Sequence, residues 1–403
     1  MTLHRYSFFS SFFCYLFTFI VFFFKNYRFS YYCAMSLAKL DSAAAAKLLE
    51  PLKYILLDID GVIWSGSTVI EGVPETLRYL KEEKKKHVRF LTNNAAWSRE
   101  EICEKFASRG MPFVQPNEIY NSGYAAALKL QQLLGKTDKT SGERKVHGNV
   151  FVIGEEGLHK ELRHVLADGF ITYGLELNRI EEENYYDIQT VSTAWESRVL
   201  PPPQQRLVLC QGDRCEMFMA GTPTGNNCIS LSDLNCVAVV AGLDLHFNVQ
   251  KLAYASLILQ GKPKALWANG VTEEKASFIA CNEDPQIPVG PLKLLLPGAG
   301  GMVQSLVTVS GIPPHAVCGK PNTDLSKILF EAEKVVNPSE ECLMVGDRLS
   351  TDICFGNNSN CKTLFVLSGA EGLEDVTKAS QENNTSFLPQ NIADSLACFL
   401  PTR

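Results

Sequence analysis

The sequence lacks the cysteine spacing of zinc-binding and redox motifs. Thirteen cysteines are present, which is an odd number, and no two of them are spaced as CxxC. The pattern therefore indicates neither a zinc site nor a disulfide framework. Reduced thiols, as in a cytosolic enzyme, are the simpler interpretation.

An excess of positive charge is also absent. The 403 residues include 38 Lys and Arg against 44 Asp and Glu, so the formal net charge is −6. Nucleic acids are bound through clustered Lys and Arg, and this balance argues against nucleic acid as the main partner. Hydrophobic residues make up 46% of the chain, and a chain of this length is expected to form two or three domains that each bury a core.

One long uncharged run lies near the start of the chain. Residues 7–24 carry no charge, which is near the lower limit for a membrane span and long for the core of a signal peptide. Three interpretations stay open: a membrane anchor whose following charges, Lys25 and Arg28, hold the rest of the chain in the cytoplasm, a cleaved signal, or a misassigned start. The sequence from Met35 is typical of the beginning of a soluble protein. We expect a cytoplasmic enzyme that is active from Met35 onward, with membrane contact only if residues 7–24 are an anchor.

The remaining chain alternates between predicted strands and helices. Ser98, followed three residues later by Glu101, is a good helix N-cap. Apolar runs that read as buried parallel strands occupy residues 54–60, 88–94, 342–347 and 363–367. With helices between them, the two ends of the chain are predicted to form one doubly wound parallel sheet of the Rossmann-like α/β class.

A long insertion separates the two halves of the predicted sheet. We expect a hydrophobic segment at 1–35, an α/β core formed by 36–120 and 297–403, and an inserted α/β domain at 121–296. Within the insertion, residues 178–235 are acidic, then proline-rich, then rich in glycine, asparagine and threonine. That composition predicts an irregular excursion of low order.

Two acids close the first predicted strand. Asp58 and Asp60 are followed by Gly61, which allows a tight backbone turn. Ligands of open parallel sheets bind beyond the carboxyl ends of the strands. Two carboxylates there repel each other unless something positive lies between them, and a divalent cation is the usual answer. For this motif alone, an acidic strand end that only caps a helix is the alternative.

The second strand ends in a polar triplet, and a lysine follows much later. Thr92, Asn93 and Asn94 offer a hydroxyl and two amides, which can donate to phosphate oxygens without adding charge. Lys320 supplies a cation on a loop between glycine and proline. Each signal alone is weak, because polar strand ends are common and a lone lysine usually faces solvent.

A third strand end carries an acid at Asp347, with a second acid, Asp352, five residues later on the entering helix. A second strand-end acid can complete an all-oxygen Mg²⁺ site with the first. All four motifs occur in one order, each at a strand end or loop, and together they predict a site for a metal ion and a phosphate.

The motifs DIDGV, TNN, GKP and GDRLSTD, in this order, resemble those of the haloacid dehalogenase-like hydrolases, over about residues 53–373. More narrowly, YILLDIDGVIW, VIGEEGL, LLPGAG and CGKPN are similar to the branch of phosphoglycolate phosphatases, pyridoxal phosphatases and 4-nitrophenylphosphatases. That branch carries a large α/β cap inserted between the second and third motifs. The segment ACNED departs from the branch's ATNPD at Cys281 and Glu283.

The resemblance implies a role for each matching residue. Asp58 would be the nucleophile and Asp60 the general acid and base. A Mg²⁺ ion would be held by the Asp58 carboxylate, the Asp60 backbone carbonyl and Asp347, and Asp352 would orient the waters on the metal. The phosphate would be bound by Thr92 and Lys320. Asn93 and Asn94 stay candidates for further donors because of their amides, independently of the resemblance.

The resemblance also indicates the substrate side. The segment LDLHF is similar to a cap segment that brings a histidine toward the substrate, so His246 is a candidate substrate contact; an ordinary surface histidine is the alternative. The predicted function is a Mg²⁺-dependent phosphatase of small phosphorylated metabolites, with 2-phosphoglycolate as the first substrate and pyridoxal 5′-phosphate as the second. A homodimer through the cap stays open. The rival is a non-catalytic, membrane-tethered binding protein on the same fold, which would be expected to have lost Asp58, Asp60 or Lys320.

Overall fold

The computed structural model describes residues 38–137, 144–146, 148–166, 171–178, 216–218, 228–230, 236–261, 275–289 and 294–401. The predicted hydrophobic segment at 1–35 lies outside the described residues, as does nearly all of the predicted excursion at 178–235. Among the helices of the described ranges, none is both long enough and apolar enough to cross a membrane.

Six parallel strands form the first sheet, in the order β19–β18–β17–β1–β4–β5. Their bounds are Tyr54–Leu57 for β1, His87–Thr92 for β4, Ile119–Asn121 for β5, Cys342–Gly346 for β17, Lys362–Val366 for β18 and Asn391–Ala393 for β19. Because β1 lies between β4 and β17, the polar residues that follow these three strands meet at one edge of the sheet. The predicted doubly wound core is confirmed.

Helices cover both faces of this sheet. All four side chains of β1 are buried, and alternate ones serve opposite faces. Ile55 and Leu57 pack with α2 (Ser42–Leu49), α3 (Val73–Arg78) and α4 (Arg99–Ser108). Leu56 packs with α11 (Asp324–Glu333) and α13 (Cys354–Asn358) on the other face. Two further helices are α12 (Pro338–Glu341) and α14 (Leu373–Gln381).

The capping signal at the start of α4 is confirmed. Ser98 accepts from the Glu101 backbone N–H, and the Glu101 side chain accepts from the Ser98 backbone N–H. This reciprocal capping box fixes where the helix begins. It therefore also fixes which side chains of α4 lie over the sheet edge.

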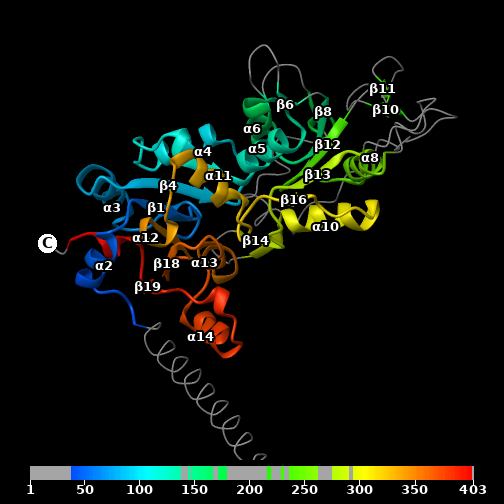
Figure 1. Cartoon of the computed structure of the whole chain (residues 1–403). Coiled ribbons are helices and arrows are strands. Elements are labelled where there is room, and N and C mark those ends of the chain that lie inside the picture. Colours follow the sequence, from blue (N-terminus) through cyan, green and yellow to red (C-terminus); the bar gives the residue numbers. More distant parts are fainter. Residues whose placement is uncertain are drawn as a thin grey trace, which may run out of the picture.

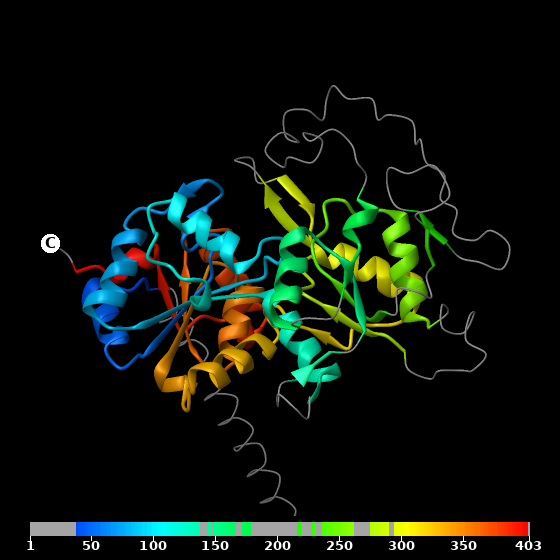
Figure 2. The same cartoon turned by 90° about the horizontal axis from the view of Figure 1, so that it is seen from above.

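A second sheet contains five parallel strands in the order β16–β13–β12–β8–β9. The strands are β8 (Asn149–Ile153), β9 (Thr172–Tyr173), β12 (Cys236–Ala241), β13 (Ser277–Ala280) and β16 (Ala316–Val317). Helices α5 (Ser122–Leu134) and α6 (Glu156–Leu166) pack on one face. Helices α8 (Val249–Leu259) and α10 (Ala299–Ser310) pack on the other. Figures 1 and 2 both show the two sheets, each with its helices, side by side.

The second part of the first sheet's domain was predicted to begin at residue 297, but the chain stays with the second sheet as far as β16. β16 pairs with β13, and the helix α10 before it packs against α8. The reason is hydrophobic, because Met302, Val303 and Leu306 of α10 are buried in the core of the second sheet. α10 therefore belongs to the second sheet.

Short elements complete the described structure. Four antiparallel hairpins pair β2 (Trp64–Ser65) with β3 (Thr68–Val69), β6 (Lys136–Thr137) with β7 (Arg144–Lys145), β10 (Glu216–Phe218) with β11 (Cys228–Ser230), and β14 (Gln286–Val289) with β15 (Leu294–Pro297). Short helical segments are η1 (Tyr79–Glu83), η2 (Pro116–Glu118), η3 (Leu175–Leu177), η4 (Leu349–Ile353), η5 (Thr385–Phe387) and η6 (Leu396–Phe399).

Candidate active site

Asp58 directly follows β1 and lies at the carboxyl end of the six-stranded sheet beside a buried lysine. Lys320 Nζ donates to Asp58 Oδ1 at 2.5 Å and to the Leu91 carbonyl at 3.0 Å. It also lies 2.7 Å from Asp352 Oδ1. Three acceptors from different parts of the chain therefore fix the ammonium group next to Asp58.

Three acids form a cluster at this edge, here named the carboxylate cluster: Asp58, Asp347 and Asp352. One oxygen of each lies within 4.8 Å of the others. Asp347 follows β17 directly, and Asp352 belongs to η4. Asp352 Oδ2 accepts from the backbone N–H of Asp347 at 3.2 Å and of Arg348 at 3.1 Å. The turn after β17 is thus held by one of the acids that it carries.

The carboxylate cluster carries more negative charge than its lysine can offset. Burial raises the pKa of Asp58 well above its usual range; Lys320 opposes this, whereas Asp352 and Asp347 add to it. Burial, together with Asp352, raises the pKa of Asp347 to about 7. Burial alone would lower the pKa of Lys320, but Asp352 and Asp58 outweigh it and raise that pKa. These carboxylates therefore favour a further cation.

One oxygen in the cluster is left without a partner. Asp347 Oδ2 accepts from the Ala370 N–H at 2.6 Å, but Asp347 Oδ1 is buried and has no hydrogen-bond partner among the described residues. Glycines at 61 and 369 leave room for this carboxylate, because a Cβ at either position would overlap it. A buried carboxylate oxygen without a donor is costly, and Mg²⁺ prefers carboxylate oxygens. The donor set therefore fits a divalent cation.

A cavity of about 360 Å³ lies in front of the cluster. It is bounded by strand ends of the first sheet and by loops of the second sheet. Eight of the nine residues predicted for the site line it: Asp58, Asp60, Thr92, Asn93, Asn94, Lys320, Asp347 and Asp352. The topology has brought together motifs that are far apart in the sequence.

Asp60 differs from the cluster because its side chain is exposed to the cavity. The Trp64 indole Nε1 donates to Asp60 Oδ1 at 2.9 Å, and the other carboxylate oxygen has no hydrogen bond within the part of the chain that the structure describes. Thr92 is buried and accepts from the Asn94 backbone N–H at 3.1 Å. Asp60 is thus the acid of this site that is open to solvent and held by a neutral donor.

The side-chain amide of Asn93 was predicted to donate to phosphate, but in the structure it is hydrogen-bonded to other residues of the protein. Its Nδ2 donates to the Asp284 carboxylate at 3.0 Å and to the Lys320 carbonyl at 3.0 Å. Its Oδ1 accepts from the Lys320 N–H at 2.8 Å. Its own carbonyl accepts from Asn282 at 2.7 Å and from Ser122 at 2.6 Å. The side chain therefore positions Lys320, and both ends of its amide are occupied.

Asn93 also lies where the chain crosses between the two sheets. The chain leaves the first sheet at β5, and Ser122 then begins α5. It leaves the second sheet at β16 and reaches Lys320 shortly afterwards. Both crossings are hydrogen-bonded to Asn93, so one residue joins the sheets beside the nucleophile.

Two polar cavity residues from the second sheet were not predicted, namely Asn282 and Asp284. Both follow β13, and burial raises the pKa of Asp284. A polar group after the end of an apolar run was the available signal. The pairing with Asn93 is not readable from the sequence, because the partners are far apart along the chain.

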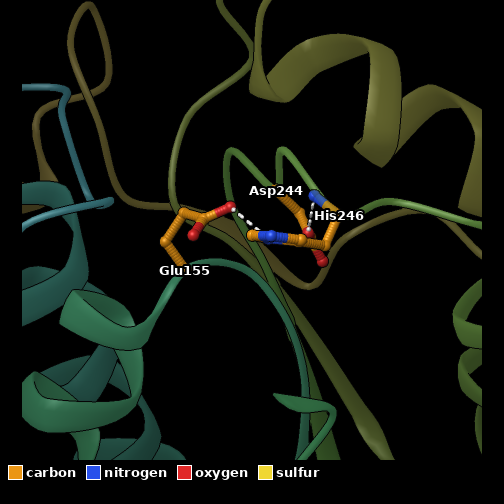
Figure 3. Close-up of side chains that lie close together, drawn as sticks. All are labelled: Glu155, Asp244 and His246. Atoms are coloured by element: carbon orange, nitrogen blue, oxygen red, sulfur yellow. Dashed lines mark hydrogen bonds and ion pairs between the residues drawn. The ribbon is translucent and has the colours of Figure 1, made fainter. Parts of the chain in front are cut away.

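His246 takes part in a different group, here named the histidine cluster: Glu155, Asp244 and His246 (Figure 3). His246 Nδ1 lies 3.4 Å from Glu155 Oε1, and the His246 N–H donates to Asp244 Oδ1 at 2.8 Å. Lys251 donates to the other oxygen of Asp244 at 2.6 Å, and both side chains are fully buried. Burial alone would raise the pKa of Glu155, but hydrogen bonds from His246 and from the Leu245 amide lower it. His246 is not among the described residues that line the cavity.

Comparisons with known proteins agree with this geometry. The family model of the haloacid dehalogenase-like hydrolases matches residues 55–166, and a second, HAD-hydrolase-like model matches residues 317–397. The chain is 32% identical over 371 residues to the chloroplastic phosphoglycolate phosphatase 1A of Arabidopsis thaliana, covering 90% of this chain and 81% of that one. It is 29% identical over 375 residues to the glycerol-3-phosphate phosphatase of Mus musculus, covering 90% and 94%.

A solved structure shares the fold. A glycerol phosphate phosphatase of Mycobacterium tuberculosis in complex with magnesium superimposes with a TM-score of 0.58 at 22% identity, covering 90% of this chain and 78% of that one.

Proposed function

Since the chain belongs to the haloacid dehalogenase-like hydrolases and is a phosphoric monoester hydrolase, we propose that it hydrolyses small phosphomonoesters with Mg²⁺ through a phosphoaspartate on Asp58. The observation that carries this proposal is the position of Asp58. It lines a cavity, contacts a buried ammonium group, and lies close to a carboxylate oxygen of Asp347 that has no donor among the described residues.

Lys320 prepares the site for a phosphate dianion. A carboxylate and a phosphate repel each other, so attack by Asp58 needs positive charge nearby. Lys320 is fixed by Asp58, Asp352 and the Leu91 carbonyl, and needs little reorganisation when the substrate binds. Asn93 holds the backbone of Lys320. Thr92 and Asn94, which line the same cavity, are proposed donors to the phosphate oxygens.

The metal ligands in this proposal are the Asp58 and Asp347 carboxylates and the Asp60 carbonyl, with Asp352 close by. A bound Mg²⁺ would offset the charge of the cluster and polarise the phosphoryl oxygens.

Asp58 and Asp60 divide the chemistry between them. Asp58 attacks phosphorus, the bond from phosphorus to the leaving-group oxygen breaks, and Asp60 gives that oxygen a proton. Asp60 then takes a proton from the water that attacks the phosphoaspartate, which releases inorganic phosphate and restores Asp58. The exposed Asp60 side chain, held at one oxygen by Trp64, suits a group that must exchange protons at the cavity.

We take 2-phosphoglycolate as the first substrate because the relative at 32% identity is named a phosphoglycolate phosphatase. Glycerol 3-phosphate, after the second relative, and pyridoxal 5′-phosphate, from the sequence resemblance, are the alternatives. The second sheet with its helices is proposed as the cap that closes over the leaving group. We place the enzyme in the cytoplasm, with membrane contact only if residues 7–24 are an anchor.

A metal-dependent assay on 4-nitrophenyl phosphate tests the proposal. Turnover is expected to need Mg²⁺ and to disappear in Asp58→Asn, which is nearly isosteric but cannot attack phosphorus. A panel of 2-phosphoglycolate, glycerol 3-phosphate and pyridoxal 5′-phosphate then ranks the substrates by kcat/KM. Full activity in excess chelator, or absence of any phosphatase activity in folded protein, would count against the proposal and favour the non-catalytic alternative.

A further inference from the structure

A second, smaller cavity of about 130 Å³ adjoins the candidate active site. It shares Asp60, Gly66, Thr92 and Asn94 with the larger cavity. The rest of its wall comes from Ile59, the β2–β3 hairpin, the segment before α4, and α4 itself. A group bound at Asp60 therefore has this second space directly beside it.

Two cations at the end of α4 line the small cavity. Lys105 and Arg109 are four residues apart and so lie on the same side of the helix. Lys105 Nζ lies 3.3 Å from the centroid of the Trp97 ring, and Arg109 Cζ lies 4.2 Å from that of the Trp64 ring. Both tryptophans line the cavity as well. Each cation is thus held over an aromatic face, and this contact restricts the positions of the charged group.

The Lys105 ammonium group is not paired with any anion of the described residues, although Asp60 lines the same cavity. Among the described residues it has no ion pair and no hydrogen bond, although its side chain is partly buried. Burial lowers its pKa to about 8; Asp60 opposes this shift and Arg109 adds to it. Arg109 makes one hydrogen bond, to the Gly66 carbonyl at 3.3 Å. Two cations beside a cavity, one of them unpaired, favour a bound anion.

We propose that this small cavity is a subsite for an oxyanion of carboxylate or phosphate size, held by Lys105 and Arg109. The inference rests on the proposed function, in which Asp60 protonates the leaving-group oxygen. Because Asp60 lines both cavities, an acidic group attached close to that oxygen lies next to the two cations. The subsite therefore selects phosphomonoesters whose leaving group carries a second negative charge.

The same oxyanion chemistry can come from two sources. It can be the acidic group of the substrate itself, or a separate small carboxylate such as the product glycolate. The first source changes the preference between substrates, whereas the second changes the rate with every substrate and depends on added anion.

Steady-state kinetics on the full chain distinguish these sources. The variants are Lys105→Met, which keeps a long side chain over Trp97, and Arg109→Gln, with Lys47→Met on the exposed surface of α2 as the matched control. For each variant, kcat/KM is measured with 2-phosphoglycolate, whose leaving group is charged, and with glycerol 3-phosphate and 4-nitrophenyl phosphate, whose leaving groups carry no additional acid. Glycolate is then added to the 4-nitrophenyl phosphate assay at constant ionic strength.

A substrate-borne anion predicts that Lys105→Met lowers kcat/KM for 2-phosphoglycolate at least about tenfold and changes the other two substrates less than about threefold. A separate anion predicts a glycolate effect that Lys105→Met removes. An equal loss of kcat/KM with all three substrates, together with an unchanged glycolate effect, would mean that the two cations only stabilise the β2–β3 hairpin. That result would overturn the proposed subsite. If thermal denaturation shows that Lys105→Met is unfolded, the same ratios of kcat/KM between substrates are measured for Arg109→Gln instead. Failure of the proposed function looks different, because wild-type protein would then show no Mg²⁺-dependent turnover of 4-nitrophenyl phosphate.

Discussion

The carboxylate cluster and the histidine cluster contain similar groups but differ in how the acidic oxygens are hydrogen-bonded. Each brings acidic oxygens within 4.8 Å of one another, and each has a buried lysine. In the histidine cluster, both oxygens of Asp244 are occupied, one by the His246 N–H and one by Lys251. In the carboxylate cluster, Asp347 keeps a buried oxygen with no partner among the described residues, and its three acids line the large cavity.

The difference shows what separates a reactive cluster from a structural one. Proximity of acids and a nearby lysine are common to both. An oxygen left without a donor, at the wall of a cavity, occurs in the carboxylate cluster. That feature leaves room for a cation, whereas the satisfied pair of Asp244 and Lys251 mainly fixes the loop that follows β12.

The largest effects are expected when one carboxylate in each cluster is exchanged for an amide. The exchange in the carboxylate cluster should reduce activity, and the exchange in the histidine cluster should reduce stability. Asp58→Asn is expected to lower kcat by about 10³-fold or more with no loss of thermal stability, because it removes a nucleophile and also a crowded charge. Asp244→Asn should leave Lys251 buried without a carboxylate and cost about 3–5 kcal/mol of stability. Paired measurements of kcat and of urea denaturation test both halves. Loss of activity without loss of stability in Asp244→Asn would break the comparison.

Mg²⁺ should stabilise the protein through the carboxylate cluster. At about a hundred times its dissociation constant, a ligand of the folded state adds about 2.7 kcal/mol, which thermal denaturation with and without Mg²⁺ would detect. Asp347→Asn should abolish most of that shift, since the unpartnered oxygen is lost as a charged ligand. Glu155→Gln in the histidine cluster is the matched control and should keep it. If Mg²⁺ still stabilised Asp347→Asn but no longer stabilised Glu155→Gln, the metal would bind at the histidine cluster and the comparison would be wrong.

The neighbourhood of the histidine cluster should make stability depend on pH. His159 on α6 is fully buried, and neither ring nitrogen has a hydrogen-bond partner among the described residues. Burial, with Arg163 and Lys251, lowers its pKa to about 3. The unfolded chain therefore binds a proton more readily below about pH 6.5, and stability falls as the pH falls.

Between pH 7 and pH 5 this effect is worth about 2 kcal/mol. His159→Leu should remove that part of the slope, and the variant should be at least as stable as wild type at pH 5. Urea denaturation at several pH values gives the comparison. Identical slopes for the two proteins would show that His159 does not titrate as its burial implies.

The smallest effect is expected for the charge of Glu155. In Glu155→Gln the side-chain oxygen can still accept from the Leu245 N–H, which it does at 2.7 Å in the wild type, but the attraction to His246 is lost. The two side chains are 20% and 24% exposed, so the loss of stability should be about 0.5–1 kcal/mol. A much larger loss would mean that the histidine cluster is held together as tightly as the carboxylate cluster.

The sequence is most informative where short motifs end apolar strands. Asp58, Thr92 and Asp347 each lie at a strand end, and parallel strands bring such ends to one edge. That rule places most of the candidate site without any knowledge of long-range contacts. Lys320 is harder to place, because no such rule applies to a lysine on a loop. Its own signal is weak, and it gained meaning from its order among the other motifs and from the resemblance of its motif.

Other features depend on contacts that the sequence does not encode locally. The apolar face of α10 suits either sheet, and only packing decides that it joins the second. The amide of Asn93 looks free in the sequence but is occupied by Lys320 and Asp284 in the fold. His246 carries a motif, yet its side chain faces Glu155. Long-range hydrogen bonding decides these cases.

The position of Asn93 at both chain crossings has a mechanical consequence. Asn93 ties the two sheets together through Ser122 and Lys320, and the second of these bonds holds the backbone of the lysine beside Asp58. Any displacement of the second sheet that keeps both bonds intact therefore leaves the Lys320 backbone next to the nucleophile. The ammonium group on which the chemistry depends is held at the junction between the two sheets, where relative displacement is smallest.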